Sequence, residues 1–289
     1  MRAARLCLWT ALISVAAAAP TAEWAHEVEI GSFETNFWDS VLRQQGQNWN
    51  RFDTKKEIVT SLRPYLGLPD VPVIISQPAK ELKICVVGSG PSSDIGYRGW
   101  PDAEVTLFLT DPLATRYKRS FSVFNAFPPA SIIPLAGEEL LKLFQPNTFD
   151  MMYSVNALDH SYEPALALRT MLAVAKPCAW VVFELWENEA VLEKGSGMHK
   201  WNVAVTHRGQ NRAIMTLTKF GGLNQTDLRA MLLSRQQNEH GPASYVRVEA
   251  FHGCYLNGDC NRAQDRRVRL SARKQGEHCP RQPPIPRAS

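Results

Sequence analysis

The feature that most constrains the fold of this sequence is an alternation of short apolar segments with helical stretches, which begins at residue 83. The apolar segments are short and are closed by Gly, Asp or Pro, so they are predicted to be strands. Strands that alternate with helices form a mostly parallel sheet covered on both faces. We therefore predict an α/β protein with three layers, α/β/α. The expected strands are 83–87, 105–110, 131–135, 149–155 and 179–185, with a helix at 164–174 before the last of them.

The alternation stops after residue 185, and the later segments are expected to add antiparallel pieces. Residues 201–206 and 213–218 flank a polar turn and predict a hairpin. A short helix at 226–233 precedes a strand at 245–251, which is expected to be the C-terminal antiparallel strand. Apolar residues at helical spacing predict a helical cap within 30–68. The expected units are a leader at 1–22, the N-terminal helical cap at 23–80, the main domain at 81–253 and a tail at 254–289.

The first residues have the layout of a targeting segment. Arg2 and Arg5 precede an apolar run at 6–19, and small residues follow. This layout predicts a secretory signal peptide, although a short uncleaved anchor or an organellar leader also fits. The run is shorter than the roughly 20 residues that a membrane span needs. We expect a location in the secretory pathway or a lumen, with an organelle as the alternative, and no transmembrane span beyond this possible anchor.

The positive charge is concentrated at the end of the sequence. The chain has a net charge of +4, but residues 261–289 hold eight Lys and Arg against two acids, so the rest is close to neutral. A nucleic-acid-binding face on the main domain is therefore not expected. The basic, proline-containing stretch 254–289 is predicted to be disordered.

The six cysteines do not form a metal-binding pattern. Cys85 and Cys178 lie in apolar runs and are expected to be inert and buried. Cys254 and Cys260 are expected to form a disulfide if the compartment is oxidising, while the state of Cys279 stays open. No spacing in the sequence resembles a zinc site, so no metal is expected.

Residues suited to ligand binding follow the expected strands. Gly88 and Gly90 follow the first strand, where a missing side chain lets the backbone approach a ligand. Asp111 follows the second strand, and a carboxylate there can accept hydrogen bonds from both hydroxyls of a ribose. Glu138 follows the third strand and Asn156 the fourth. Parallel strands end at one edge of a sheet, so these residues are predicted to meet in one nucleoside-binding crevice.

The glycine spacing indicates which nucleoside cofactor is bound. A dinucleotide fingerprint would need a third glycine at position 93, which is Ser93, and Pro91 interrupts the loop. Together with Asp111 and the later hairpin, this pattern favours S-adenosylmethionine as the cofactor. An NAD(P)-dependent oxidoreductase that uses the same crevice is the enzymatic alternative.

Five short motifs within residues 83–201 carry a resemblance to a known family. They are Val86-Val87-Gly88-Ser89-Gly90-Pro91, Asp111-Pro112-Leu113-Ala114, Asn156-Ala157-Leu158-Asp159-His160, Lys176-Pro177 and His199-Lys200-Trp201-Asn202. With these motifs the sequence resembles class I S-adenosylmethionine-dependent methyltransferases, in particular a methyltransferase type 11-like subgroup of unassigned substrate. The resemblance implies a Rossmann-like fold and methyl transfer.

The resemblance also implies roles for single residues. The family commonly has an acidic residue two positions before the first glycine, where it helps to hold the cofactor's ammonium, but this sequence has Val86. The implied cofactor contacts are Gly88, Ser89 and Gly90 at the methionine part, Asp111 at the ribose, Glu138 or else Glu139 beside the adenine, and Asn156 near the sulfonium.

Methyl transfer needs a base only if the accepting atom must lose a proton. His160 and His199 are the candidate catalytic bases because histidine titrates near neutral pH, and Asp159 is expected to orient a neighbour or to deprotonate a hydroxyl. The expected acceptor is a small or sugar-like molecule. A non-catalytic descendant of the fold that binds a nucleoside is a third hypothesis, for which Val86 is one ground.

Overall fold

The computed structural model places part of the chain in one α/β fold. It describes residues 28–45, 62–68, 80–91, 93, 95, 102–125, 128, 130–195, 198–207, 213–238, 241–252, 266–277 and 279. The expected leader at 1–22 and the expected disulfide between Cys254 and Cys260 lie outside these residues. No helix among the described residues has both the length and the apolar composition that a membrane crossing needs.

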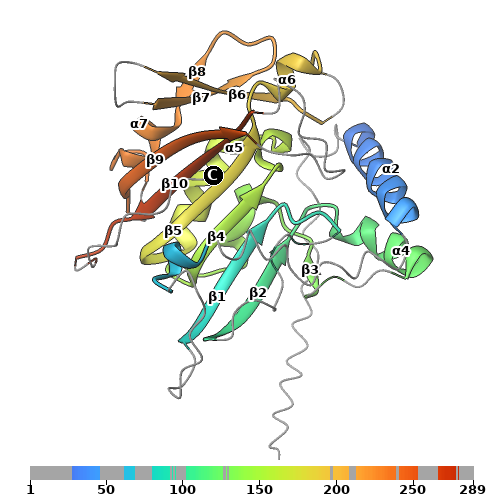
Figure 1. Cartoon of the computed structure of the whole chain (residues 1–289), viewed down its shortest axis with the longest axis horizontal. Helices are drawn as coiled ribbons and strands as arrows, with labels where there is room; N and C mark the ends of the chain where they lie inside the picture. The colour runs from blue at the N-terminus through green and yellow to red at the C-terminus, as the bar shows by residue number, and fades with distance from the viewer. Residues whose placement is uncertain are drawn as a thin grey trace, which may run out of the picture.

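A seven-stranded sheet forms the centre of the fold (Figure 1). Its order is β3-β2-β1-β4-β5-β10-β9, and the first five of these strands are parallel. β10 runs antiparallel to both of its neighbours. The strands are β1 Lys80–Val87, β2 Ala103–Thr110, β3 Ile132–Ile133, β4 Phe149–Val155, β5 Ala175–Trp186, β9 Ala243–His252 and β10 Arg266–Lys274. The predicted mostly parallel sheet is thus confirmed.

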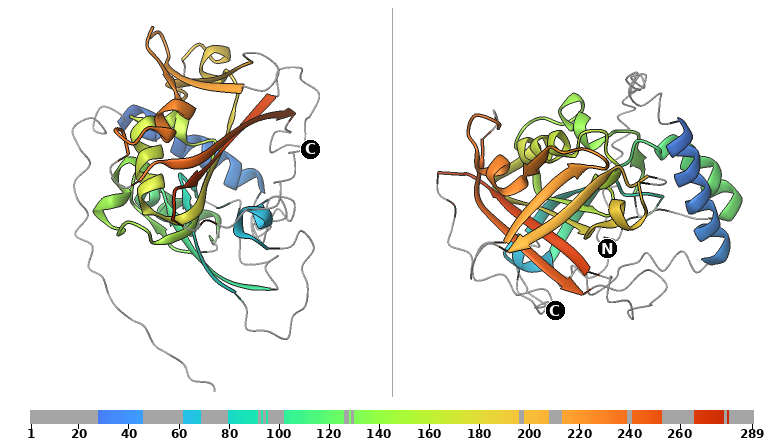
Figure 2. Two further views of the ribbon diagram at one scale, coloured as in Figure 1. Left: turned by 90° about the vertical axis from the view of Figure 1, so that its left-hand side faces the viewer. Right: turned by 90° about the horizontal axis from the view of Figure 1, so that it is seen from above.

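The helices flank this sheet and connect its strands. α2 and α4 pack side by side on the side of the sheet where β2 and β3 lie, away from β9, as Figure 1 and the right view of Figure 2 show. The elements are α2 Val28–Gln45, η2 Arg63–Leu66, α4 Ala114–Phe124, η3 Gly137–Lys142, η4 Leu158–His160, α5 Pro164–Val174, α6 Glu189–Leu192 and α7 Leu228–Leu233. The predicted helical cap therefore contains α2 and η2.

Both faces of the sheet are buried, as the three-layer prediction requires. Along β1, Cys85 and Val87 pack into the hydrophobic cluster that α5 and α7 cover. Ile84 and Val86 point to the opposite face and join a second cluster with Tyr65 of the η2 region. Both faces of a parallel strand are covered by other elements, so residues on both faces are apolar. This explains why the sequence of each strand is a continuous apolar run.

A second, three-stranded antiparallel sheet follows β5. It consists of β6 Trp201–His207, β7 Ala213–Lys219 and β8 Gln225–Asp227. The predicted hairpin is confirmed as β6 and β7. The predicted helix at 226–233 begins two residues later than expected, because residues 225–227 pair with β7. Asp227 then caps α7, since its Oδ1 accepts a hydrogen bond from the Ala230 N–H at 3.0 Å.

The prediction of a disordered tail at 254–289 is wrong for residues 266–274, which form β10 inside the sheet. Val268, Leu270 and Ala272 are fully buried on one side of this strand. Arg269 is also buried, and its guanidinium pairs with Glu184 of β5 at 2.6 Å. The high density of arginines concealed a strand pattern of period two.

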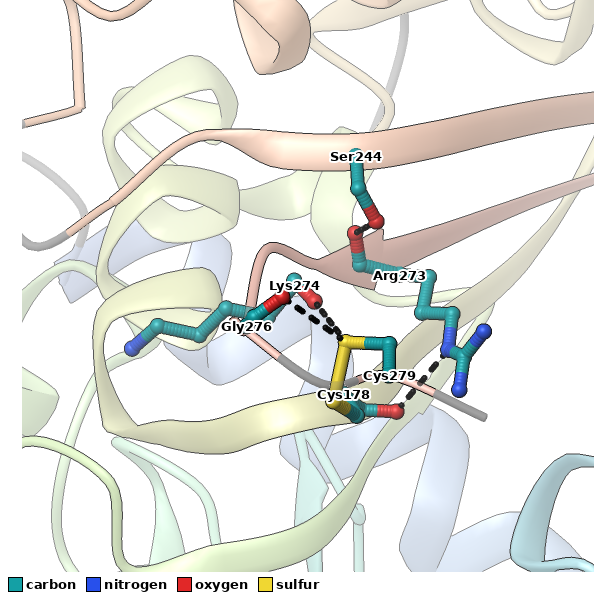
Figure 3. Close-up of a disulfide and its surroundings, with 6 residues drawn as sticks. All are labelled: Cys178, Ser244, Arg273, Lys274, Gly276 and Cys279. Atoms are coloured by element: carbon teal, nitrogen blue, oxygen red, sulfur yellow. Dashed lines mark hydrogen bonds between the residues drawn. A yellow bond between two sulfur atoms is a disulfide. The ribbon is translucent and has the colours of Figure 1, made fainter. Parts of the chain in front are cut away.

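A disulfide fixes the end of this strand to the sheet. Cys178 at the start of β5 is bonded to Cys279 just after β10 (Figure 3). The expectation that Cys178 is an inert core residue is therefore wrong, whereas Cys85 is a free, buried cysteine as expected. The arginine next to the end of β10, Arg273, donates from its Nε to the carbonyl of Cys178 at 3.2 Å.

The disulfide predicts a measurable contribution to stability. The bond spans 101 residues of sequence, so it restricts the unfolded chain, an effect typically worth about 2–4 kcal/mol. Replacing Cys178 and Cys279 by Ser, singly and together, should lower the free energy of unfolding by this amount in urea denaturation. The double variant should lose no more than either single variant, because one bond is removed in all three. Additive losses would contradict this account.

Candidate active site at the carboxyl ends of the parallel strands

A pocket lies where β1, β2, β3 and β4 end. Its cavity volume is about 50 Å³, and it opens to solvent. The crevice predicted from the strand ends is present at the predicted place. The described residues that line it are Glu34, Val87, Gly88, Asp111, Pro112, Leu113, Ala136, Gly137, Glu138, Ala157, Leu158, His160 and Ser161.

The turn after β1 requires glycine at two positions. Gly88 and Gly90 have φ angles of +66° and +60°, which side-chain-bearing residues rarely adopt. A Cβ on Gly88 would lie 2.3 Å from the Cβ of Ala157, and one on Gly90 would lie 3.0 Å from the indole of Trp38. Ser89 between them is buried and donates from its Oγ to the Gly90 carbonyl. The backbone of this turn therefore packs tightly against the loop after β4 and against α2.

Asp111 lies directly beside this turn. Its Oδ2 accepts a hydrogen bond from the Gly90 N–H at 2.9 Å, and its Oδ1 accepts one from the Leu113 N–H at 2.8 Å. Burial raises the pKa of this carboxyl to about 6, although both backbone hydrogen bonds oppose the rise. Each oxygen keeps further accepting capacity toward the pocket.

Glu34 of α2 is a pocket residue that the sequence analysis missed. Its Oε1 accepts hydrogen bonds from Trp38 Nε1 and from the Tyr117 hydroxyl of α4, both at 3.3 Å. Burial and, to a lesser extent, the nearby Asp111 carboxylate together raise the pKa of Glu34 to about 8. The available signal was an acid one helical turn before Trp38, on the apolar face of an amphipathic helix.

Of the two acids after β3, only one lines the pocket. Glu138 is buried, and its Oε1 accepts a hydrogen bond from the Glu163 N–H at 3.1 Å. Glu139 is half-buried, lies outside the described pocket lining and pairs with the exposed Lys142 at 2.5 Å. Asn156 follows β4 with a φ angle of +47°, but it is not among the described residues that line the pocket. Its buried Oδ1 has no hydrogen-bond partner.

The three candidate catalytic residues form one cluster beside the pocket. Asp159 Oδ2 lies 2.5 Å from His199 Nδ1, and His160 Nε2 lies 3.2 Å from the same nitrogen. Asp159 and His160 belong to η4, whereas His199 precedes β6, so two separate motifs meet here. Of the three, His160 lines the pocket.

The cluster perturbs the pKa values of its members. Burial opposes the charge of His199, but the hydrogen bond and the negative charge of Asp159 outweigh it and raise the pKa of His199 to about 9. Burial lowers the pKa of His160. Burial would raise the pKa of Asp159, but the two histidines together lower it. The acid Glu189 of α6 lies 3.5 Å from His199, and burial followed by Asp159 raises its pKa to about 8.

The lining of the pocket has a one-sided charge. Three carboxyl groups, those of Glu34, Asp111 and Glu138, face it, and no Lys or Arg is among the described lining residues. Such a lining favours a cationic ligand over a phosphorylated one, because a cation beside these carboxyl groups favours their ionised form, including that of Glu34, which otherwise holds a proton up to about pH 8.

Comparisons with known proteins find structural neighbours of low similarity. No family model and no curated protein sequence matches the chain. Among solved structures, a possible histamine N-methyltransferase from Thermotoga maritima is similar at 12% identity and a TM-score of 0.44, over 85% of this chain and 100% of the other. A 1,6-didemethyltoxoflavin N1-methyltransferase from Burkholderia thailandensis, solved with S-adenosylhomocysteine, is similar at 14% identity and a TM-score of 0.42, over 90% and 93%. A putative methyltransferase from Haloferax volcanii, in complex with an activator protein, is similar at 10% identity and a TM-score of 0.45, over 86% and 98%.

The sheet itself defines the fold. Five parallel strands in the order β3-β2-β1-β4-β5, extended by an antiparallel β10 and by β9, form a Rossmann-like α/β fold with a mostly parallel sheet. The fold predicted from the motifs is confirmed.

The packing of Gly88 predicts a specific sensitivity to substitution. Gly88→Ala introduces a Cβ that collides with Ala157, so it should lower the free energy of unfolding by about 1–3 kcal/mol more than the backbone strain alone. Gly221→Ala is the matched control, because Gly221 has a similar φ angle of +76° and open space where its Cβ would lie. Thermal unfolding of both variants measures the difference. Equal losses would contradict the contact with Ala157.

The raised pKa of Glu34 predicts a dependence of stability on pH. The folded protein keeps a proton on Glu34 up to about pH 8, whereas an unfolded chain loses it near pH 4.5. This contribution is complete below pH 4.5 and is lost as the pH rises through 8. Glu34→Gln, which cannot ionise, should therefore flatten the decline in melting temperature between pH 5 and pH 8. An unchanged slope in the variant would contradict the burial of this carboxyl.

Proposed function

We propose that the protein binds S-adenosylmethionine in this pocket and transfers its methyl group to a small-molecule acceptor. The observation that carries the proposal is the charge of the lining. S-adenosylmethionine has a sulfonium, an ammonium and one carboxylate, and so a net positive charge. Asp111 and Glu138 offset that charge, and no described lining residue is Lys or Arg. Glu34 holds a proton up to about pH 8 in the empty pocket, but a cation bound beside it would favour its ionised form, so it can offset the charge once the cofactor is bound. A nicotinamide dinucleotide has two negatively charged phosphates, which this lining would repel, so the oxidoreductase alternative is disfavoured.

The geometry of the pocket fits the parts of the cofactor. The buried Asp111 carboxylate, held by two backbone N–H groups, keeps accepting capacity for the two hydroxyls of a ribose. Glu138, beside the turn after β3, is available to the adenine. The left-handed turn at Gly88 exposes backbone to the methionine part. Asn156, outside the described lining, remains a proposed neighbour of the sulfonium through its unpaired Oδ1.

Glu34 can replace the acidic residue that the family pattern has at position 86, where this sequence has Val86. Val86 is buried in the hydrophobic cluster on the far face from α5 and cannot present a charge to the pocket. Glu34 brings a carboxyl to the same end of the pocket from α2, close to Asp111. We therefore assign to Glu34 the electrostatic role toward the cofactor's ammonium that an acid at position 86 would have.

The chemistry requires little of the protein beyond orientation and exclusion of water. The bound cofactor supplies a methyl group on a sulfonium that is already reactive. The residues of the pocket would hold donor and acceptor in line, which in favourable cases contributes roughly 7–11 kcal/mol to the lowering of the barrier. An acceptor hydroxyl or amine must also lose its proton, and the cluster of Asp159, His160 and His199 lies where His160 reaches the pocket.

We also propose that the protein resides in an oxidising compartment of the secretory pathway. The disulfide between Cys178 and Cys279 supports this location, because such bonds persist mainly in oxidising environments. Sequencing of the mature N-terminus after expression in a eukaryotic cell tests it. A start at Met1 in protein isolated from cytosol would contradict it.

The proposal predicts which ligand stabilises the protein. Saturating S-adenosylmethionine or S-adenosylhomocysteine should raise the melting temperature, whereas NAD should not, because a ligand stabilises the folded state that binds it, by about 2.7 kcal/mol at a hundred times its Kd. Glu138→Gln should weaken binding by about tenfold, since it removes one charged acceptor. Glu139→Gln is the control and should leave binding unchanged, because this neighbouring acid is not among the described lining residues and pairs with Lys142 instead.

Three outcomes separate the hypotheses. Stabilisation by NAD alone would contradict the proposal in favour of the oxidoreductase. Binding of S-adenosylhomocysteine without transfer of a labelled methyl group to any compound in a small-molecule extract would favour the non-catalytic descendant. Equal weakening by Glu138→Gln and Glu139→Gln would contradict the assignment of the pocket.

A further inference from the structure

We propose that Asp159, His160 and His199 bind a divalent transition-metal ion beside the pocket. The three donor atoms already converge. His160 Nε2 lies 3.2 Å from His199 Nδ1 and 3.5 Å from Asp159 Oδ2, and the third separation, from Asp159 Oδ2 to His199 Nδ1, is 2.5 Å. A tetrahedral ion with bonds of about 2.1 Å holds its ligand atoms about 3.4 Å apart. Two of the three separations match this spacing, and the third must open by about 1 Å as a hydrogen bond is exchanged for two metal bonds.

A second observation points to a cation-binding site. The side chain of Asp159 is 4% exposed, yet its Oδ1 has no hydrogen-bond partner. The buried Oε2 of Glu189, 3.5 Å from His199 Nδ1, has none either. Buried carboxylate oxygens without partners are costly, and most such groups in proteins are satisfied by a donor or an ion. One cation at the cluster would satisfy the Asp159 carboxylate directly and would attract the Glu189 carboxylate.

Hydrogen bonds alone do not satisfy this cluster. His199 Nδ1 lies within 3.5 Å of three acceptors or donors, namely Asp159 Oδ2, His160 Nε2 and Glu189 Oε2. A ring nitrogen carries at most one hydrogen, so it can donate to one of them only. Acidic side chains also outnumber arginines around the cluster. Glu193 lies 3.5 Å from His199 Nε2, in addition to Asp159 and Glu189, and the arginine whose charge acts on Glu189 is Arg267.

The donor set indicates the class of metal. Two imidazole nitrogens and one carboxylate oxygen suit Zn²⁺, Fe²⁺ or Mn²⁺ better than Mg²⁺ or Ca²⁺, which prefer oxygen ligands throughout. Three protein ligands leave a coordination position open, which is typical of catalytic rather than structural zinc sites. The sequence pattern could not predict this site, because the third ligand, His199, follows the first two by about forty residues and comes from a different motif.

The proposed ion has a chemical use at this place, and this use rests on the proposed methyl transfer. His160 lines the pocket, so an ion bound to it lies beside the acceptor. An acceptor hydroxyl bound at the open position would have a lowered pKa and would lose its proton to solvent, which leaves an oxygen nucleophile for the methyl group. In this account the histidines hold the ion and do not themselves remove the proton.

Metal binding is measured without S-adenosylmethionine. A negative result for the metal therefore does not depend on whether the proposed methyl transfer takes place. Untagged protein is treated with EDTA, dialysed, and titrated with Zn²⁺, Mn²⁺, Fe²⁺ under reducing conditions, and Mg²⁺, by isothermal calorimetry. We expect one ion per chain for at least one of the first three metals and no comparable binding of Mg²⁺. Asp159→Asn and His199→Ala should each weaken metal binding by more than about a hundredfold. Substitution of a residue that only hydrogen-bonds to a metal ligand costs at most about a hundredfold, so a larger loss identifies a direct ligand. Asp150→Asn is the matched control, because Asp150 pairs with Lys176 at the opposite end of β4.

A measurement on the unaltered protein covers the case in which a variant fails to fold. Co²⁺ bound by two nitrogens and one oxygen in a four-coordinate site gives visible absorption bands, and Zn²⁺ should displace them at one equivalent. Absence of stoichiometric binding for Zn²⁺, Mn²⁺, Fe²⁺ and Co²⁺ would overturn the proposal and leave a hydrogen-bonded histidine pair. Loss of binding in Glu193→Gln but not in Asp159→Asn would overturn it too, since it would move the ion to Glu189, Glu193 and His199. Binding of S-adenosylhomocysteine by the EDTA-treated protein would leave the proposed function intact in either case.

Discussion

The carboxylate of Asp111 is the constraint on which the pocket depends. It accepts one N–H from the turn after β1 and one from the start of the turn after β2, so the two loops cannot move independently. The same loops are joined by the backbone, because the N–H groups of Gly88 and Ser89 both donate to the carbonyl of Thr110. Removal of the carboxylate would leave the N–H groups of Gly90 and Leu113 without this acceptor inside a buried region. The two turns that line the proposed nucleoside site would then no longer be held together by it.

The elements that the sequence predicted well are those whose pattern is local. The expected strand at 149–155 and the helix at 164–174 coincide with β4 and α5, since an apolar run between turn residues and a Pro at a helix start are short-range signals. The structure of the tail differs from the prediction because its many arginines dominate its composition and hide its alternation of buried and charged residues. Val268, Leu270 and Ala272 recur at every second position, and that period indicates a strand whatever the charge of the residues between them.

The candidate site was predictable only where its residues follow strands. Asp111, Glu138 and the pair Asp159-His160 come directly after expected elements, and the topology of a parallel sheet brings them to one edge. Glu34 could not be placed in this way, because it reaches the pocket from α2, a helix outside the sheet whose position depends on packing against α4. The contact between His160 and His199 and the bond between Cys178 and Cys279 join residues that are distant in sequence, and no local pattern encodes such pairs.

The position of β10 has a consequence for the order in which the chain can fold during synthesis. Among the described strands, β9 is hydrogen-bonded to the large sheet through β10, which pairs with β5 on its other side. A nascent chain that ends before residue 266 therefore exposes the edge of β5 and leaves β9 without its strand partner, and both edges are templates for incorrect pairing with other chains. The sheet can close only after residues 266–274 have been synthesised, so its assembly comes late in the synthesis of the chain.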